Sequence, residues 1–125
     1  MLRETLTKAM ALHQAGKLAE AERAYRSILN VRPDQLDALY YLGMLEAQQG
    51  RHAAALASYN QVLALMPVGN AEIFYNRGVV LQAMKRNEEA LSSYDRALAI
   101  TPNDADVLTN RGIVLYELNR YEEAL

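Results

Sequence analysis

The sequence contains no cysteine, which excludes disulfide bonds, thiolate nucleophiles and cysteine metal sites. Excess charge is also scarce, because 13 Lys and Arg residues face 15 Asp and Glu residues, for a net charge of −2. So weak a field does not attract nucleic acid, and we expect no nucleic-acid partner. Long apolar runs are missing as well: the longest have only a few residues, whereas a membrane helix needs about 18. We therefore expect no membrane partner.

The patterns that an enzyme would need are absent too. The two histidines, His13 and His52, do not form an HExxH motif, and the glycines occur singly rather than as GxGxxG or GxxxxGK[ST]. We therefore expect a non-catalytic protein that has no cofactor and no metal site. The first residues carry Glu4 and lack an apolar signal core, so we expect a cytoplasmic location.

A repeat is the main feature that the sequence does contain. Pro33, Pro67 and Pro102 are separated by 67 − 33 = 34 and 102 − 67 = 35 residues. An Ala-x3-Tyr phrase precedes each proline, at Ala21 and Tyr25, Ala55 and Tyr59, and Ala90 and Tyr94. A fourth copy begins at Ala124. Gly43, Gly78 and Gly112 lie upstream of the second, third and fourth copies, and Ala9 stands in the corresponding place of the first. A period of about 34 residues indicates an array of helical repeats.

This pattern resembles the tetratricopeptide repeat, whose signature is W-x2-L-G-x2-Y, then A-x3-F, then P. Leu39, Phe74 and Leu108 stand where that family often has tryptophan. The resemblance implies an all-α fold of tandem antiparallel helix hairpins, stacked in a right-handed superhelical solenoid. Residues 1–125 would form one array, divided into repeats 2–35, 36–70 and 71–104 and a partial repeat 105–125, with one additional residue around Gly69.

Local signals agree with helical hairpins. Apolar residues recur at spacings of three and four, which predicts amphipathic helices. Gly16, Gly50 and the Lys85 segment are expected to end first helices. Asp34 and Asn103 are predicted as N-caps of the next first helices.

The signature positions also predict the core. Three pairs, Gly43 with Ala55, Gly78 with Ala90 and Gly112 with Ala124, are expected to place small residues on facing helices. In the family that the chain resembles, the two helices of a hairpin cross closely there. The tyrosines of the Ala-x3-Tyr phrases are expected to fill the core toward the next repeat.

In the family that the chain resembles, first helices line a concave groove, and three columns of these helices can be compared. The columns are Met10, Met44, Val79 and Ile113; Leu6, Tyr40, Tyr75 and Thr109; and Thr7, Tyr41, Asn76 and Asn110. From them we predict a peptide-binding groove formed by Tyr40, Tyr41, Met44, Tyr75, Asn76, Val79, Asn110 and Ile113. Tyrosine offers a large contact area with a polar tip, and asparagine can bond both a peptide C=O and an N–H.

Two alternatives stay open for these columns. The apolar column can pack between adjacent first helices, and Asn76 and Asn110 can serve the packing of the repeats themselves. The asparagine pair resembles the asparagine ladder in the repeat arrays of O-linked N-acetylglucosamine transferases, although only two of four rungs are present.

The sequence therefore predicts a scaffold that binds a protein or peptide. One alternative is an N-terminal accessory region that recruits substrate for a larger enzyme such as a glycosyltransferase, and another is a self-assembling structural array. Residues 121–125 supply only the beginning of a second helix, so we expect a fragment of a longer array. The apolar face carrying Leu108, Leu115 and Leu118 would then lack a complete partner, which predicts self-association through the C-terminal end.

Overall fold

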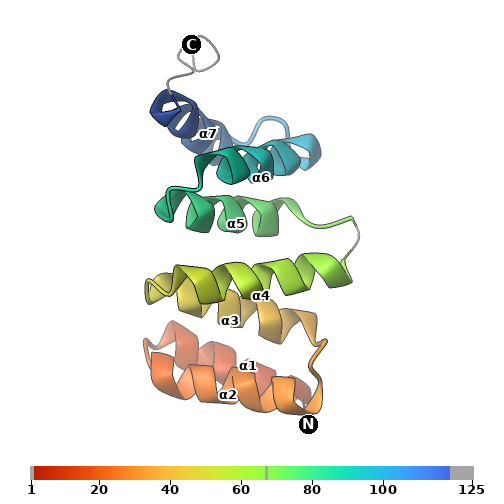
Figure 1. The fold of residues 1–125 in the computed structure, drawn as a ribbon. Coiled ribbons are helices and arrows are strands. Elements are labelled where there is room, and N and C mark those ends of the chain that lie inside the picture. The colour runs from red at the N-terminus through yellow and green to blue at the C-terminus, as the bar shows by residue number, and fades with distance from the viewer. Residues whose placement is uncertain (1, 67, 119–125) are drawn as a thin grey trace. The chain divides into compact units, whose positions relative to one another are not determined.

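The computed structural model describes residues 2–66 and 68–118, and within these ranges the chain is helical, without strands (Figure 1). The helices are α1 (Leu2–Gln14), α2 (Leu18–Val31), α3 (Leu36–Gln48), α4 (His52–Leu65), α5 (Ala71–Ala83), α6 (Asn87–Ile100) and α7 (Ala105–Glu117). The predicted all-α fold of tandem hairpins is confirmed. No helix in these ranges combines the length and the hydrophobicity that crossing a membrane takes.

The helix starts follow the period of the sequence. First helices begin at residues 2, 36, 71 and 105, which gives spacings of 34, 35 and 34 residues. The additional residue falls in the connection before α5, where Gly69 has a φ of 76°. Two of the prolines also act as expected, because α2 ends two residues before Pro33 and α6 ends two residues before Pro102. Pro67 lies outside the described residues.

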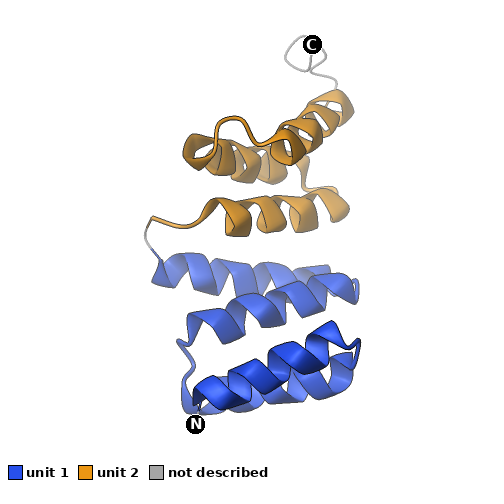
Figure 2. Ribbon diagram, turned by 180° about the vertical axis from the view of Figure 1, so that it is seen from behind, with its two compact units in different colours: residues 1–67 blue, residues 68–125 orange. Residues whose placement is uncertain are grey.

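The chain divides into two compact units (Figure 2). The first, Met1–Pro67, contains the hairpins α1–α2 and α3–α4, and α2 also packs against α3. The second, Val68–Leu125, contains the hairpin α5–α6 and then α7, which packs against α6.

The three hairpin turns share one backbone conformation. Gly16, Gly50 and Lys85 have positive φ angles of 80°, 76° and 61°. The next residue then bonds back into the helix, as when Arg86 N–H donates to the Leu81 carbonyl at 2.9 Å. The predicted helix ends are confirmed, and Lys85 adopts at a cost of about 1 kcal/mol the conformation that glycine adopts freely.

Side chains cap three of the first helices. Gln35 Oε1 accepts from the Ala38 N–H at 2.7 Å, and Asp104 Oδ1 accepts from the Val107 N–H at 3.3 Å. Asn70 caps α5 in the same way. Each cap satisfies N–H groups that have no partner within the helix.

The predicted caps Asp34 and Asn103 are therefore wrong by one residue. The reason is a turn after α2 and after α6, closed by Gln35 N–H to Arg32 O at 3.1 Å and by Asp104 N–H to Thr101 O at 3.3 Å. The proline occupies the second position of that turn and Asp34 or Asn103 the third, so the fourth residue becomes the cap.

Small residues meet tyrosine rings at the hairpin crossings. A Cβ atom added to Gly43 would lie 2.7 Å from Tyr59 Cε1, and one added to Gly78 would lie 2.5 Å from Tyr94 Cε1. Ala90 is fully buried beside this crossing, as is the corresponding alanine of α4. The predicted close approach is confirmed at Gly43 and Gly78, where the tyrosine ring requires it. Ala124, the predicted partner of Gly112, lies outside the described residues.

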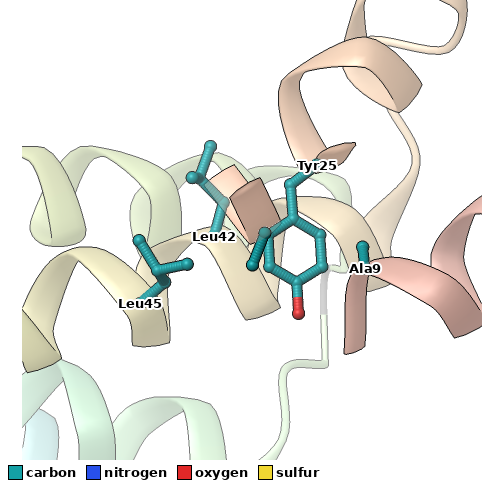
Figure 3. Close-up of a cluster of buried hydrophobic side chains, with 5 residues drawn as sticks. Ala9, Tyr25, Leu42 and Leu45 are labelled. Atoms are coloured by element: carbon teal, nitrogen blue, oxygen red, sulfur yellow. The ribbon is translucent and has the colours of Figure 1, made fainter. Parts of the chain in front are cut away.

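The repeated tyrosines are core residues, as predicted. Figure 3 shows the Tyr25 ring beside Ala9, Leu42 and Leu45, all members of one buried cluster in the first unit. The ring also stacks on Tyr41 of α3, with centroids 6.3 Å apart and planes 17° apart. Tyr25 thus joins its own hairpin to the next, in the direction that the sequence predicts.

The apolar face of α7 differs from the prediction at one position. Leu115 is buried rather than uncovered, because α7 packs against α6 with the side that also carries Val107 and Val114. Leu108 is about half exposed, as expected for a side chain without a complete partner. The beginning of the next helix, residues 121–125, lies outside the described residues.

Candidate protein-binding pockets

In the first unit, the first helices of the two hairpins enclose a pocket of about 180 Å³. It is lined by Met10, His13 and Gln14 from α1, Tyr25 from α2, and Tyr41 and Met44 from α3. The structure therefore brings two predicted groove residues, Tyr41 and Met44, into one pocket. Their neighbour Tyr40 lies between Tyr41 and the core Tyr59, with ring centroids 5.7 Å and 5.9 Å away.

A hydrogen-bonded chain joins the polar atoms of this pocket. His13 Nε2 lies 2.8 Å from Gln48 Oε1, and His13 Nδ1 lies 3.1 Å from the Tyr25 hydroxyl. An amide oxygen only accepts, so Nε2 carries the proton, and in the neutral ring Nδ1 accepts from the hydroxyl. Burial raises the pKa of Tyr25 to about 12, and the nearby Tyr41 adds to the rise. The hydroxyl is therefore a proton donor at neutral pH.

The second unit has a pocket of about 330 Å³ between α5 and α7. It is lined by Val79, Gln82, Ala83, Lys85, Asn110 and Glu117. Val79, Gln82 and Asn110 lie two repeats after Met10, His13 and Tyr41 of the first pocket, since 79 − 10, 82 − 13 and 110 − 41 all equal 69. The Tyr94 hydroxyl donates to Gln82 Oε1 at 2.7 Å, as the Tyr25 hydroxyl does to His13. The same position between two first helices thus forms a pocket in each unit.

The asparagine column is engaged within the protein. Asn110 Nδ2 donates to the Tyr75 hydroxyl at 3.2 Å, and the Tyr75 ring lies 6.1 Å from that of Tyr94. Burial raises the pKa of Tyr94, and a hydrogen bond from Asn110 opposes part of the rise. Asn76 also has an interaction partner. These contacts favour the packing alternative, and peptide binding by Asn76 and Asn110 stays a prediction.

We expect Asn110→Ala to lower the free energy of unfolding by about 0.5–1.5 kcal/mol, because Tyr75 loses a partly buried hydrogen bond. Thr109→Ala, at the exposed neighbouring position of α7, is the control and should change it by less than about 0.5 kcal/mol. Denaturant unfolding of both variants measures the difference. Equal stability of the two variants would contradict a packing role for Asn110.

Two predicted groove residues remain open to solvent in the second unit. Val79 is 39% exposed on α5 and Ile113 is 44% exposed on α7. Apolar side chains of this size usually gain free energy when a partner covers them. The corresponding Met10 and Met44 of the first unit are half-buried in the pocket.

Several lining residues of the two pockets are not among the predicted groove residues. His13 and Gln82 follow the apolar column by one helical turn, which places them on the same face as Met10 and Val79. The spacing of one helical turn is the feature of the sequence that places both residues beside the apolar column. Metal and acid–base chemistry, the other roles of a histidine, do not point to this pocket. Among the described residues, no group of three His, Asp or Glu side chains is placed to hold a metal ion.

Two family profiles described as tetratricopeptide repeat match the chain, at residues 6–70 and 70–125. The chain belongs to the tetratricopeptide repeat family. It is therefore a scaffold for protein–protein interaction, which agrees with helical hairpins that expose pockets between their first helices.

Curated relatives include other proteins that contain tetratricopeptide repeats. Protein O-mannosyl-transferase TMTC3 of Homo sapiens is 32% identical over 87 residues, which cover 69% of this chain and 9% of that protein. Photosystem I assembly protein Ycf3 of Acaryochloris marina is 35% identical over 66 residues, covering 51% of this chain and 40% of that protein. The chain thus spans only a small part of the transferase's length.

Solved structures share the tetratricopeptide fold over nearly the whole chain. The MamA AMB-1 structure has a TM-score of 0.91 at 24% identity and covers 100% of this chain and 68% of that one. MamA from Desulfovibrio magneticus RS-1 has a TM-score of 0.92 at 18% identity, with coverages of 99% and 70%. At these identities the likeness shows the tandem-hairpin fold alone.

Proposed function

We propose that this tetratricopeptide scaffold binds a peptide segment of a partner protein on the first helices of each unit. The binding residues are those of the predicted groove: Tyr40, Tyr41 and Met44 in the first unit, and Tyr75, Asn76, Val79, Asn110 and Ile113 in the second. The observation that carries the proposal is the pocket found at the same repeat position in both units. Pockets with an apolar part and a few polar groups are the usual places for ligands.

Exposed apolar side chains beside the second pocket support the proposal. Covering the exposed part of Val79 and Ile113 removes apolar area from water at about 25 cal/mol per Å². Lys85 and Glu117 are exposed at the same pocket and offer charges of both signs to a partner. A segment with apolar and polar side chains therefore fits this surface better than a uniformly charged one.

The experiment compares two isoleucines of nearly equal exposure. Ile113 on α7 is 44% exposed, and Ile100 at the end of α6, a second helix, is 45% exposed. Peptides are selected from a displayed random library with the wild-type chain, and their affinities are measured by calorimetry. Ile113→Asp should weaken binding at least about tenfold, which is 1.4 kcal/mol, because it places a charge in an apolar contact. Ile100→Asp should leave the affinity unchanged.

Equal affinities of the two variants for the selected peptides would overturn the proposal. Thermal unfolding of both variants serves as the folding control. Both side chains are substantially exposed, so both variants should melt close to the wild type.

Two other functions have support from particular observations. The O-mannosyl-transferase relatives favour an accessory region of a larger enzyme, and the reading frame beyond residue 125 tests that function. Exposed Leu108 and Tyr116 on α7 favour self-association through the C-terminal end. Sedimentation over a range of protein concentrations tests self-association.

A further inference from the structure

We propose that the first-unit pocket accepts one aromatic side chain of phenylalanine size from the bound partner, and that the second-unit pocket does not. The proposal rests on the peptide-binding function above and specifies the chemistry of the ligand. Four features of the pockets support it: the volume of the first, its methionine and tyrosine lining, the bonding of its polar groups, and the difference in charge between the two pockets.

The volume of the first pocket suits a single phenyl ring. An apolar protein cavity of about 150 Å³ is large enough to bind benzene. The pocket between α1 and α3 measures about 180 Å³ and is open on one side, so a ring can enter while its peptide backbone remains outside. Gln14 is an exposed member of the lining and can bond that backbone.

The lining of the first pocket suits an aromatic ring chemically. Met10 and Met44 are flexible and polarisable, and a sulfur–aromatic contact contributes about 0.3–1.5 kcal/mol. Tyr41 adds an aromatic surface, held in place by stacking on Tyr25. None of the six lining residues is Asp, Glu, Lys or Arg, so a charged side chain would find no opposite charge there.

Two of the polar side chains that line the first pocket already have partners. The Tyr25 hydroxyl bonds His13, and His13 bonds Gln48. A phenyl ring that displaces water from the pocket therefore leaves these groups bonded, which avoids the penalty for an unsatisfied polar group.

The second pocket differs at the same positions. Val79 replaces Met10, Asn110 replaces Tyr41, and Lys85 and Glu117 add a cation and an anion to the lining. Both charged side chains are exposed, so an apolar ring that packs against them would displace part of their water without pairing either charge. The aromatic side chain is therefore directed to the first unit.

Methionine methyl groups provide the test, because the chain has five methionines and two of them line the first pocket. The intact chain, labelled with ¹³C at the methionine methyls, is titrated with N-acetyl-phenylalaninamide. We expect saturable shifts of the Met10 and Met44 methyl signals, assigned through Met→Leu variants. Met66 should not shift, and neither should Met84, which lies between Ala83 and Lys85 of the second pocket. N-acetyl-lysinamide should bind at least about tenfold more weakly, because its ammonium group would lose water in a pocket that offers no opposite charge.

A variant that obstructs the pocket gives a second test. Gln14→Trp adds an indole at the mouth and should reduce affinity for the phenylalanine probe at least about tenfold. Gln61→Trp, at an exposed glutamine of α4 outside this pocket, is the matched control and should bind like the wild type. Both substitutions are at exposed helical positions, and thermal unfolding verifies that both variants fold.

The inference is overturned if the probe shifts all methyl signals without saturation, or if the lysine probe binds equally well. It is also overturned if Gln14→Trp binds the probe as the wild type does. Failure of the peptide-binding function has another signature, namely equal peptide affinities of Ile113→Asp and Ile100→Asp while the probe still saturates Met10 and Met44. The two proposals can therefore fail separately.

Discussion

Gly78→Ala is expected to lower the free energy of unfolding by up to about 2 kcal/mol, although alanine is the better helix former. The added Cβ would lie 2.5 Å from Cε1, 2.7 Å from Cδ1 and 3.0 Å from Cζ of Tyr94. The ring cannot move away easily, because Tyr94 is fully buried and its hydroxyl is bonded to Gln82. Overpacking costs about 1–3 kcal/mol, against about 1 kcal/mol gained in helix propensity, so the clash should win.

Gly112→Ala is the matched control, since it changes the same repeat position in α7. Among residues 2–66 and 68–118, no heavy atom lies within 4 Å of a Cβ added there, so only the propensity gain of up to about 1 kcal/mol should remain. In a Tyr94→Leu background, Gly78→Ala should cost less than in the wild type, which a double-mutant cycle by denaturant unfolding measures. If Gly78→Ala and Gly112→Ala stabilised equally, the ring contact would not be what requires glycine.

Stability is expected to fall as the pH rises from about 10 to about 12, and Tyr25 should be a main cause. Tyr25 in the folded protein keeps its proton up to a pKa of about 12, because burial disfavours the tyrosinate, whereas an ordinary tyrosine has a pKa of 10.0. Between these values the unfolded chain binds fewer protons than the folded one, so the free energy of unfolding falls with pH. The contribution of the protonated Tyr25 to the free energy of unfolding is fully present below about pH 10 and is lost as the pH rises through its folded pKa. With allowance for solvent screening, this contribution amounts to about 2 kcal/mol.

Tyr25→Phe should reduce the fall in the free energy of unfolding at alkaline pH. Part of the fall should remain, because burial also raises the pKa of Tyr94. The same variant removes the hydroxyl that bonds His13, so it should already be less stable by about 0.5–1.5 kcal/mol near neutral pH. Tyr116→Phe, at an exposed position of α7, is the control and should leave the slope unchanged. Denaturant unfolding at several pH values, with tyrosinate absorbance, measures both effects. An identical slope for the wild type and Tyr25→Phe would contradict this assignment.

The sequence by itself determined the repeated local structure of the protein. The helix ends before Pro33 and Pro102 and the glycines at hairpin turns depend on neighbours within one 34-residue repeat, and both predictions are confirmed. The buried tyrosines are also confirmed, and the period marks them although they pack onto the next repeat. The family followed from the same positions, because the residues that maintain the hairpin are those that define the tetratricopeptide signature. Local geometry and local packing are encoded by short-range spacing, which a single sequence displays.

Only the tertiary structure decided which side chains of the first helices stay available to a partner. Asn110 donates a hydrogen bond to Tyr75 of the preceding repeat, 35 residues away, and Asn76 also has an interaction partner within the protein. The sequence alone made both asparagines look like free groups of a peptide-binding ladder. The turns after α2 and α6 place the caps one residue beyond Asp34 and Asn103. The pockets themselves arise where first helices of two repeats meet, and their lining depends on distances between helices. Such distances result from the packing of all the intervening side chains, which no spacing within one repeat expresses.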